Sequence, residues 1–279
     1  MTVDDISAAD NLRRLIGWNQ RPEHWRRLLQ LEPEGCFVVS LNGQLVGTVT
    51  TTSYGTAMAW IGMMLVHPDH RRRGIATRLM QQSVDYLHSR GVNCIRLDAT
   101  PAGFPLYQQL GFMSEWTLTR WQRGGNAKND FCMDKVGEAR ALREADWSAI
   151  EGIDSAAFGV KRTQLIRSLA GESIKALVWP AQGAVEGYGL LRPGPNADYL
   201  GPVICRTNEG SVSLASALLG GPANRPIFWD VPDDNAAAKS TAEGLGFTPQ
   251  RPLTRMRLGP DSVRSDPQAQ FAIADPAVG

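Results

Sequence analysis

Apolar residues recur along the chain with two different periods, and their alternation predicts a mixed α/β fold. Residues 10–30 have the spacing of amphipathic helices, whereas residues 36–53 form two β-type stretches around Leu41-Asn42-Gly43-Gln44. Asn-Gly at the centre of such a turn is typical of a β-hairpin. The rest of the first half predicts a strand at 57–66, a helix at 75–90 closed by Gly91, a strand at 93–98, a helix at 101–110 after the cap Thr100, and a strand at 114–122.

The end of this pattern occurs a second time. LYQQLGFMSEWTLTRW is matched by TAEGLGFTPQRPLTRM, so that Gly111-Phe112 corresponds to Gly246-Phe247 and Arg120 to Arg255, each 135 positions later. The same offset aligns Asp98 with Asp233 and Thr100 with Asn235. Thr and Asn are both good helix caps. An ordered series of this length indicates a duplicated domain, since the period is too long for a solenoid repeat.

The duplication predicts the domain organisation. We expect a first domain at 1–125, a linker at 126–137, a second domain at 138–258 and a tail at 259–279. The linker lies in RGGNAKNDFCMDKVGEAR, a polar stretch that contains glycine. The tail is expected to be mostly irregular, although Phe271–Ala274 could return as an edge strand.

Length and composition agree with two packed domains. The 279 residues are 43% hydrophobic, with 29 basic and 28 acidic side chains and a net charge of +1. These values give no reason to expect a nucleic acid or a membrane as partner. Cys36, Cys94, Cys132 and Cys205 form no metal-binding or disulfide pattern, so no metal is expected. The polar N-terminus and the lack of a long apolar run favour the cytoplasm.

Candidate chemistry is concentrated in MMLVHPDHRRRGIATRLMQQSVDYL, where an apolar strand is followed by a turn, three arginines and a helix. A helix start offers free N–H groups and partial positive charge to an anion, and Gly74 with Ala76 allows a phosphate to approach the backbone. The sequence therefore predicts a diphosphate site. Arg71-Arg72-Arg73 could instead be a solvated surface run. A Rossmann site and a P-loop are disfavoured because their glycine and Gly-Lys-Ser/Thr patterns are missing.

Leu65-Val66-x-Pro68-x-x-Arg71-x-x-Gly74-x-Ala76 resembles the acyl-CoA signature of the GNAT superfamily of N-acetyltransferases. Thr100, followed by Tyr107-x-x-Leu110-Gly111-Phe112, is similar to that family's second landmark. The resemblance extends over residues 1–122, and LDATPAG is similar to a bacterial subgroup with tandem GNAT domains. It implies two GNAT-like domains, each with a central mixed sheet flanked by helices, and acetyl-CoA as co-substrate.

The resemblance also implies roles for individual residues. The main chain of the strand end would bind the pantetheine arm, the turn and helix start would hold the diphosphate, Thr100 would lie beside the CoA arm, and Tyr107 would lie near the sulfur. The strand residues are Met64, Leu65 and Val66, and the diphosphate residues are Arg71, Arg72, Arg73, Gly74, Ile75, Ala76 and Thr77.

In such a site an amine would attack the thioester directly, helped by positioning and by an oxyanion donor near Leu65. Tyr107 is the candidate general acid for the leaving thiolate, although it could also be an ordinary core tyrosine. A general base is not assigned. Asp98, at the end of its strand, could be a structural cap, Glu115 and His67 are the other acid–base candidates, and ordered water could serve instead.

The second copy lacks these groups. At the offset of 135, Glu209 replaces Gly74 and Ala242 replaces Tyr107. A carboxylate at that place would repel a diphosphate. The second copy is therefore expected to have lost acyl-CoA binding and to be structural, or to wall off the acceptor site.

The leading hypothesis is an acetyl-CoA-dependent N-acetyltransferase, a monomer or homodimer that acts on a small-molecule amine. The alternative is a non-catalytic acyl-CoA-binding module with a regulatory or interaction role. Nucleic-acid binding through Arg71–Arg73 is a third hypothesis, which the net charge of +1 and the adjacent Asp69 disfavour.

Overall fold

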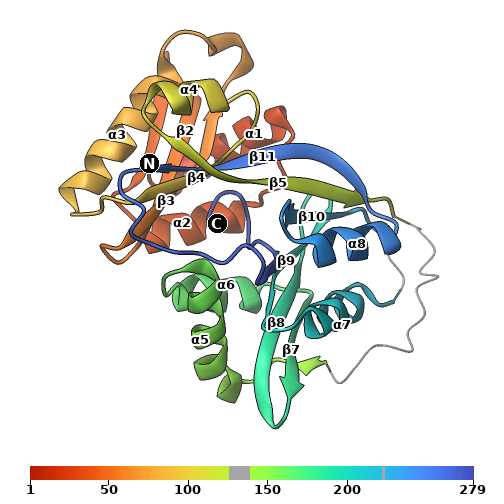
Figure 1. Ribbon diagram of the computed structural model, residues 1–279. Coiled ribbons are helices and arrows are strands. Elements are labelled where there is room, and N and C mark those ends of the chain that lie inside the picture. The colour runs from red at the N-terminus through yellow and green to blue at the C-terminus, as the bar shows by residue number, and fades with distance from the viewer. Residues whose placement is uncertain (126–138, 222–223) are drawn as a thin grey trace. The chain divides into compact units, whose positions relative to one another are not determined.

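A computed structural model describes residues 1–125, 139–221 and 224–279 (Figure 1). The first half of the described chain contains α1 (Ile6–Ile16), α2 (Pro22–Leu31), β1 (Cys36–Leu41), β2 (Gln44–Tyr54), β3 (Met58–Val66), α3 (Ile75–Ser89), β4 (Ile95–Ala99), α4 (Phe104–Gln109) and β5 (Met113–Arg123). The second contains β6 (Arg140–Ala141), α5 (Trp147–Phe158), α6 (Thr163–Gly171), β7 (Lys175–Ala181), β8 (Ala184–Arg192), β9 (Asp198–Cys205), α7 (Asn208–Leu219), β10 (Ile227–Pro232), α8 (Ala236–Gly244), β11 (Thr248–Leu258) and β12 (Gln270–Ala272).

These elements form two compact units, and neither is a continuous stretch of chain. Unit 1 consists of Met1–Glu115, Arg255–Val263 and Pro276–Gly279, and unit 2 of Trp116–Thr254 and Arg264–Asp275. The mixed α/β class predicted from the sequence is confirmed. No helix in the described ranges is both long and apolar enough to cross a lipid bilayer.

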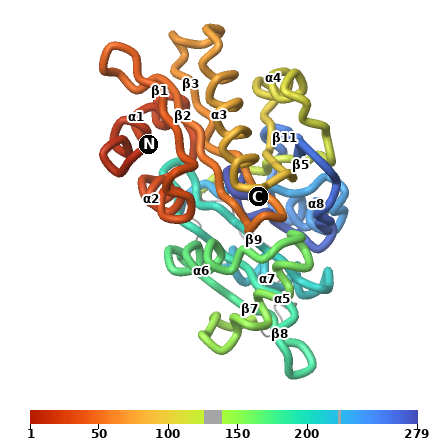
Figure 2. Tube along the Cα trace, turned by 90° about the vertical axis from the view of Figure 1, so that its left-hand side faces the viewer, coloured from red at the N-terminus to blue at the C-terminus, as the bar shows by residue number. Residues whose placement is uncertain are grey.

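In unit 1, antiparallel β1, β2 and β3 are followed by β4, which runs parallel to β3. The predicted hairpin turn is confirmed, since Asn42 and Gly43 both have the positive φ that a two-residue turn requires. The predicted helical region at 10–30 forms two helices, because Gly17 ends α1 in the left-handed region and Pro22 begins α2. Figure 2 shows α1 and α2 on one face of the sheet and α3 on the other.

Unit 2 repeats this plan. β7, β8 and β9 are antiparallel, β10 runs parallel to β9, and β5 pairs with β10 through Leu118–Arg123. Figure 1 shows α5 and α6 to one side of β8 and β9 and α7 to the other. Trp229 packs between Phe247 and Phe271 with ring centroids 5.5 Å from each. Each unit thus has an apolar core between its strands and the helices that cover them.

The two halves of the chain exchange the ends of their last strands. β5 begins in unit 1 and continues into unit 2 from Trp116, whereas β11 begins in unit 2 and reaches unit 1 at Arg255. The units therefore differ from the linear division at 1–125 and 138–258, because each needs a strand from the other half of the chain. The expected linker at 126–137 lies outside the described residues.

A buried arginine–carboxylate pair fixes each exchanged strand. Arg255 donates from Nε and Nη2 to the two carboxylate oxygens of Asp98, both at 2.9 Å, and its guanidinium lies 4.5 Å from the Trp60 ring. Arg120 binds Asp230 in the same two-pronged way, at 2.8 and 2.6 Å. Two parallel N–H···O bonds require a carboxylate as the partner of the guanidinium and fix the orientation of the two groups. These pairs attach a strand of one repeat to a carboxylate of the other.

The ion pairs correct one detail of the sequence alignment. The structural counterpart of Asp98 is Asp230 and not Asp233, which instead accepts a hydrogen bond from the Thr119 hydroxyl at 2.8 Å. Burial alone would raise the pKa of Asp230, but Arg120 and the Tyr199 hydroxyl outweigh burial and hold that pKa below its usual value. The carboxylate thus stays charged in the core.

Replacing Asp230 with Asn is expected to lower the free energy of unfolding by about 3–5 kcal/mol, because Arg120 would keep a buried charge without its counter-charge. The control Glu144→Gln breaks an exposed pair with Arg167 and is expected to cost less than about 1 kcal/mol. Because the pKa of Asp230 is lowered on folding, its contribution is present at neutral pH and is lost as the pH falls. Urea unfolding measured between pH 7 and pH 4 tests both points. Equal losses in the two variants at pH 7 would contradict the assignment.

Candidate functional site

The candidate site in unit 1 begins where two parallel strands separate. β3 and β4 are paired at Ala59 with Ile95 and at Trp60 with Arg96, and within the described chain their ladder ends there. Beyond this point the edge of β3 that faces β4 carries backbone groups without a strand partner. Met64, Leu65 and Val66 lie in this open part of β3, as the resemblance requires. An extended ligand can add to such an edge as an extra strand.

A β-bulge bends β3 within the open part. β2 and β3 are in register at Thr50 with Gly62 and at Thr48 with Leu65, so β3 has one extra residue between these pairs. Met63 takes up the difference with a φ of 49°, in the left-handed region, and its carbonyl accepts a hydrogen bond from the Thr48 hydroxyl at 2.7 Å. Bulges re-aim backbone groups and are frequent beside active sites. The bulge thus turns the main chain next to Leu65.

The turn after β3 leads into a helix whose first N–H groups have no side-chain cap. Pro68–His70 forms one 3₁₀ turn, and Gly74, with a φ of 76°, is the residue before α3. No side chain bonds to the first amides of α3, and a Cβ added at Gly74 would meet no atom within 4 Å. Ile75 is buried and anchors the helix, whereas Thr77 is exposed. The amides and the helix dipole are free to bind an anion.

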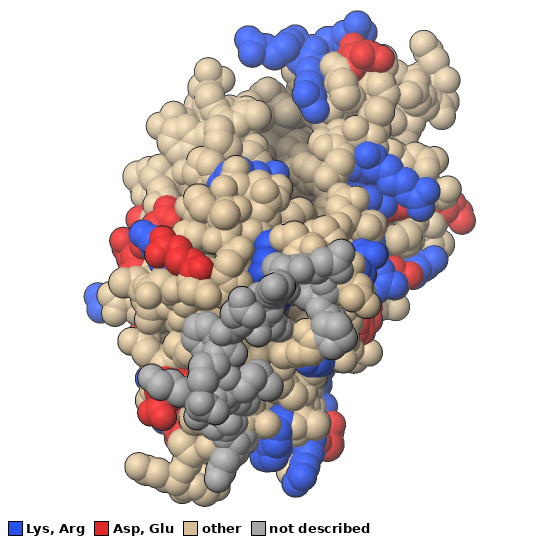
Figure 3. All heavy atoms as spheres, turned by 90° about the vertical axis from the view of Figure 1, so that its right-hand side faces the viewer, with Lys and Arg blue, Asp and Glu red and all other residues tan. Residues whose placement is uncertain are grey.

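The arginines supply further positive charge at this place. Arg71, Arg72 and Arg73 are exposed, and no carboxylate of the described residues forms an ion pair with them. Arg71 donates from Nε to the Val66 carbonyl at 3.3 Å, which draws its side chain back towards the end of β3. Figure 3 shows Lys and Arg side chains gathered at the top of the view, beside a hollow in the surface. The geometry fits a diphosphate bound at the start of α3.

Thr100 and Tyr107 lie on the far side of the open strand edge, after β4. The Thr100 hydroxyl accepts from the Gly103 amide at 3.3 Å, so it caps a turn that precedes α4, which begins at Phe104 and not at 101. Tyr107 is 8% exposed and belongs to the core cluster that includes Ile61 and Ile75. Its hydroxyl has no hydrogen-bond partner among the described residues.

Burial raises the pKa of Tyr107 to about 12. The phenol therefore keeps its proton at any working pH, which a proton donor requires. The same low-polarity surroundings would also suit a core tyrosine. The Tyr107 hydroxyl is not one of the fully enclosed polar atoms without a partner, so its oxygen is open to water or to a ligand.

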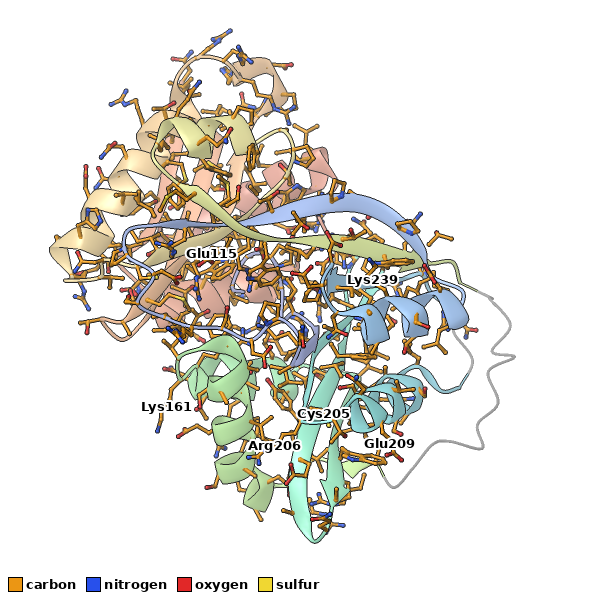
Figure 4. The ribbon with its side chains drawn as sticks, in the orientation of Figure 1. Glu115, Lys161, Cys205, Arg206, Glu209 and Lys239 are labelled. Carbon is orange, nitrogen blue, oxygen red and sulfur yellow. The ribbon has the colours of Figure 1, made fainter. Side chains whose placement is uncertain are left out.

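Two of the three candidates for a general base, Asp98 and Glu115, are bound by arginines. Asp98 is held by Arg255, and Glu115, labelled in Figure 4, is held by Arg96 and Arg257 at 2.8 and 3.1 Å. The expected cap role of Asp98 is therefore replaced by a buried ion pair. His67 accepts from the Asp69 amide through Nδ1 at 3.3 Å, in the turn beside the arginines. Both carboxylates are thus committed to ion pairs with arginines.

In unit 2 the anion-binding turn is missing. Eight residues separate β3 from α3, but only Arg206 and Thr207 separate β9 from α7. The Thr207 hydroxyl accepts from the Gly210 amide at 3.1 Å and so satisfies the helix start internally. Glu209 lies in the first turn of α7, close to Cys205 and Arg206 in Figure 4. The cap position is held by Thr207 rather than Glu209, and Ala242 is buried in α8.

The gap between the parallel strands of unit 2 is also filled. β9 and β10 are paired only from Asp198 to Leu200, and beyond that β12 pairs with β9 at Val203 and Ile204. The Ile273 amide donates to the Asp230 carbonyl at 3.2 Å, and the Trp229 indole donates to the Phe271 carbonyl at 2.9 Å. The tail thus binds both separated strands.

The tail does form a strand, β12, which pairs with β9 on the side of β9 that faces β10. The apolar pattern at 271–274 indicated a strand, but nothing in the sequence identified its partner. In retrospect, Gly201 is the residue that marks where the tail packs. A Cβ at Gly201 would clash with the Ile273 carbonyl oxygen, so the close approach of the tail requires glycine there.

Comparison with known proteins agrees with the two-unit architecture. A sequence model of the acetyltransferase (GNAT) family matches residues 6–112, and one of the acetyltransferase (GNAT) domain matches residues 150–272. YitH, an uncharacterised N-acetyltransferase of Bacillus subtilis, is 23% identical over 88% of this chain and 85% of its own.

Two solved structures share the fold. A putative acetyltransferase from Pyrococcus horikoshii has a TM-score of 0.83 and 23% identity, covering 100% of this chain and 94% of its own. A tandem GNAT protein from the clavulanic acid biosynthesis pathway has a TM-score of 0.62 and 16% identity, covering 95% of this chain and 98% of its own.

Replacing Gly74 with Glu is expected to weaken CoA binding by about 30-fold or more, because a carboxylate would face the diphosphate at a cost of about 2 kcal/mol or more. Gly74→Ala tests the backbone alone, and we expect a smaller loss, because its Cβ meets no neighbour although its φ is unfavourable. Glu209→Gln, in α7, should leave the affinity unchanged. Calorimetric titration with CoA measures all three. A loss in Glu209→Gln as large as that in Gly74→Glu would place the site in unit 2.

Proposed function

The chain is a tandem member of the GNAT acetyltransferase family, with one GNAT domain in each half, and on this premise we propose that unit 1 transfers the acetyl group of acetyl-CoA to a primary amine of a small molecule. The observation that carries the proposal is the contrast between the units. The strand edge and helix start are open in unit 1, whereas β12 and Thr207 occupy their counterparts in unit 2.

Binding would use the backbone more than side chains. The open edge of β3 at Met64–Val66 would pair with the pantetheine arm, and the amides from Gly74 to Thr77 would hold the diphosphate with Arg71, Arg72 and Arg73 around it. Thr100 would lie beside the arm on the opposite side. Acetyl-CoA brings the acetyl group as a thioester, and the protein's part is to fix that thioester in front of the amine.

The chemical step needs an oxyanion donor and a proton for the leaving thiolate. The main chain beside the bulge at Met63 aims an N–H near Leu65 at the thioester oxygen in this proposal. Tyr107, whose hydroxyl is free and protonated, would donate the proton to the sulfur. Since Asp98 and Glu115 are both held by arginines, we assign the removal of the amine proton to water rather than to a carboxylate.

A non-catalytic acyl-CoA-binding role is the second candidate. The observation that favours it is that Asp98 and Glu115, the carboxylates considered as the base, are both held by arginines. The two functions separate in a thiol-release assay with acetyl-CoA and a panel of primary amines. Release that depends on an amine supports the transferase, whereas CoA binding without release on any amine supports the binding module.

Tyr107→Phe tests the general acid. The variant is expected to lower kcat by about 10²-fold, the usual contribution of a positioned acid, and to leave the KM for acetyl-CoA unchanged. Phe112→Leu is a matched control, because its ring contacts that of Tyr107 with centroids 6.1 Å apart and carries no proton. Full kcat in Tyr107→Phe would exclude the acid role.

The pH profile gives an independent test. An acid acts only while protonated, and a pKa of about 12 keeps Tyr107 protonated up to strongly alkaline pH. We therefore expect kcat to rise or stay level up to about pH 10, because raising the pH deprotonates the amine but not Tyr107. A fall of kcat between pH 8 and pH 10 in a protein that stays folded would show that the acid has a lower pKa.

A further inference from the structure

Met63, in the bulge of β3, has a backbone conformation that its side chain disfavours. Its φ of 49° lies in the left-handed region, which a bulky residue rarely enters and which β-bulges with a left-handed first residue usually reach with glycine. Residues in such conformations persist only where the surrounding structure holds them, and they are frequent at active sites. Met63 is 1% exposed, so the group that holds it belongs to the protein and not to the solvent.

Thr48 in β2 is that group. Its hydroxyl donates to the Met63 carbonyl at 2.7 Å, and Thr48 is 0% exposed, so water does not compete for this bond. Thr48 also lies opposite Leu65, and two residues further along the ladder the His67 amide donates to the Val46 carbonyl at 2.8 Å. Hydrogen-bonded pairs alternate along an antiparallel ladder, so Thr48 and Leu65 also exchange backbone bonds. Thr48 therefore holds β3 on both sides of the residue between Met63 and Leu65.

These two attachments determine where the N–H of Met64 points. The Leu65 N–H is directed to β2, so it is not the amide that faces the open edge. The Met63 carbonyl and the Met64 N–H belong to one trans peptide and point in opposite directions. Because the Met63 carbonyl points to the Thr48 hydroxyl of β2, the Met64 N–H points away from β2. The Met64 side chain packs against the core cluster that contains Tyr107, the proposed acid.

From this geometry we propose that Thr48 is a positioning residue for acetyl transfer, whose hydroxyl keeps the Met64 N–H aimed at the thioester oxygen. The inference rests on the proposed function. As the amine nitrogen bonds to the thioester carbon, the carbonyl oxygen gains negative charge, and a fixed N–H stabilises that charge. When the C–S bond breaks, the oxygen returns to a carbonyl, the thiolate takes the proton of Tyr107 and the amine proton passes to water. Thr48 touches none of the reacting atoms and acts through the peptide between Met63 and Met64.

Unit 2 contains the same bulge without the N–H group. The extra residues of β9 are Gly201 and Pro202, at the place where the register with β8 changes. Pro202 stands in the position of Met64, and proline has no N–H. The Gly201 carbonyl accepts from Arg192 Nε at 2.8 Å, and Gly189 stands at the register position that the threonine has in unit 1. Both units thus hold the bulge carbonyl, but only the unit with the open strand edge has an N–H behind it.

Thr48→Val tests the role of the hydroxyl, because valine has nearly the same shape and cannot donate. We expect kcat to fall by about 10-fold or more, since removing an oxyanion donor costs about 10²–10³-fold and this variant misdirects the donor without removing it. The KM for acetyl-CoA should not change, because the diphosphate and the pantetheine arm bind to other groups. Thr48→Ser keeps a hydroxyl and should recover most of the kcat.

Thr51→Val is the matched control. Thr51 lies in the same strand and is also buried, but its hydroxyl donates to the Gly35 carbonyl at 2.9 Å and not to β3. The variant loses a bond of the same kind, so its Tm should fall about as much as that of Thr48→Val, whereas its kcat should be unchanged. An equal loss of kcat in the two variants would show that Thr48 acts through stability alone.

A spectroscopic measurement reports on the donor without turnover. A hydrogen bond from the Met64 N–H lowers the carbonyl stretching frequency of bound acetyl-CoA that carries carbon-13 in its thioester carbonyl. We expect this frequency to return towards the value of free acetyl-CoA in Thr48→Val, and to remain low in Thr48→Ser and Thr51→Val. An unchanged frequency in Thr48→Val would contradict the positioning role.

The kinetic outcomes separate the two proposals. Absence of transfer by the unsubstituted protein to benzylamine, ethanolamine, spermidine and the other amines of the panel overturns the proposed function and this inference with it. Transfer by the unsubstituted protein, with the same kcat in Thr48→Val as in Thr51→Val, overturns the inference alone. A loss of kcat that is confined to Thr48→Val and is recovered in Thr48→Ser supports both.

Discussion

Parallel strands that separate leave backbone N–H and C=O groups that must find other partners, and this requirement determines what each unit can do. Both units contain such a separation, between β3 and β4 and between β9 and β10. In unit 2 the chain's own tail supplies the partners, as β12 and as the bond from Ile273 to Asp230. In unit 1 the edge of β3 has no strand there, and a ligand can supply them.

The first N–H groups of the helix that follows each separated strand also need hydrogen-bond partners. α7 begins directly after β9, and the Thr207 hydroxyl satisfies its first turn. α3 begins after a longer turn that ends at Gly74, and its first amides have no side-chain partner. In unit 2 the strand edge and the helix start are therefore both paired within the chain, which agrees with the proposal that only unit 1 binds acetyl-CoA.

Local chemistry made much of unit 1 predictable from the sequence. The Asn42-Gly43 hairpin, the helix after Gly74 and the strand ending at Val66 depend on residues close in the chain, and the structure has all three. The strand exchange was not predictable, because the Arg255–Asp98 pair joins residues 157 positions apart. The constant offset of 135 also failed at Asp230, because α8 has nine residues and α4 has six, whereas the aspartate stands six positions before the start of the helix in both copies. The partner of the tail could not be derived for the same reason, since strand pairing at long range has no local signal.

We propose that only unit 1 binds acetyl-CoA, and the stoichiometry of CoA binding to the full chain is the measurement that decides this. Isothermal titration of the purified protein should give one CoA per chain. Two CoA molecules per chain would contradict the account, because β12 would then have to leave the gap between β9 and β10. No binding at all would show that the open strand edge and the uncapped helix of unit 1 are not an acyl-CoA site.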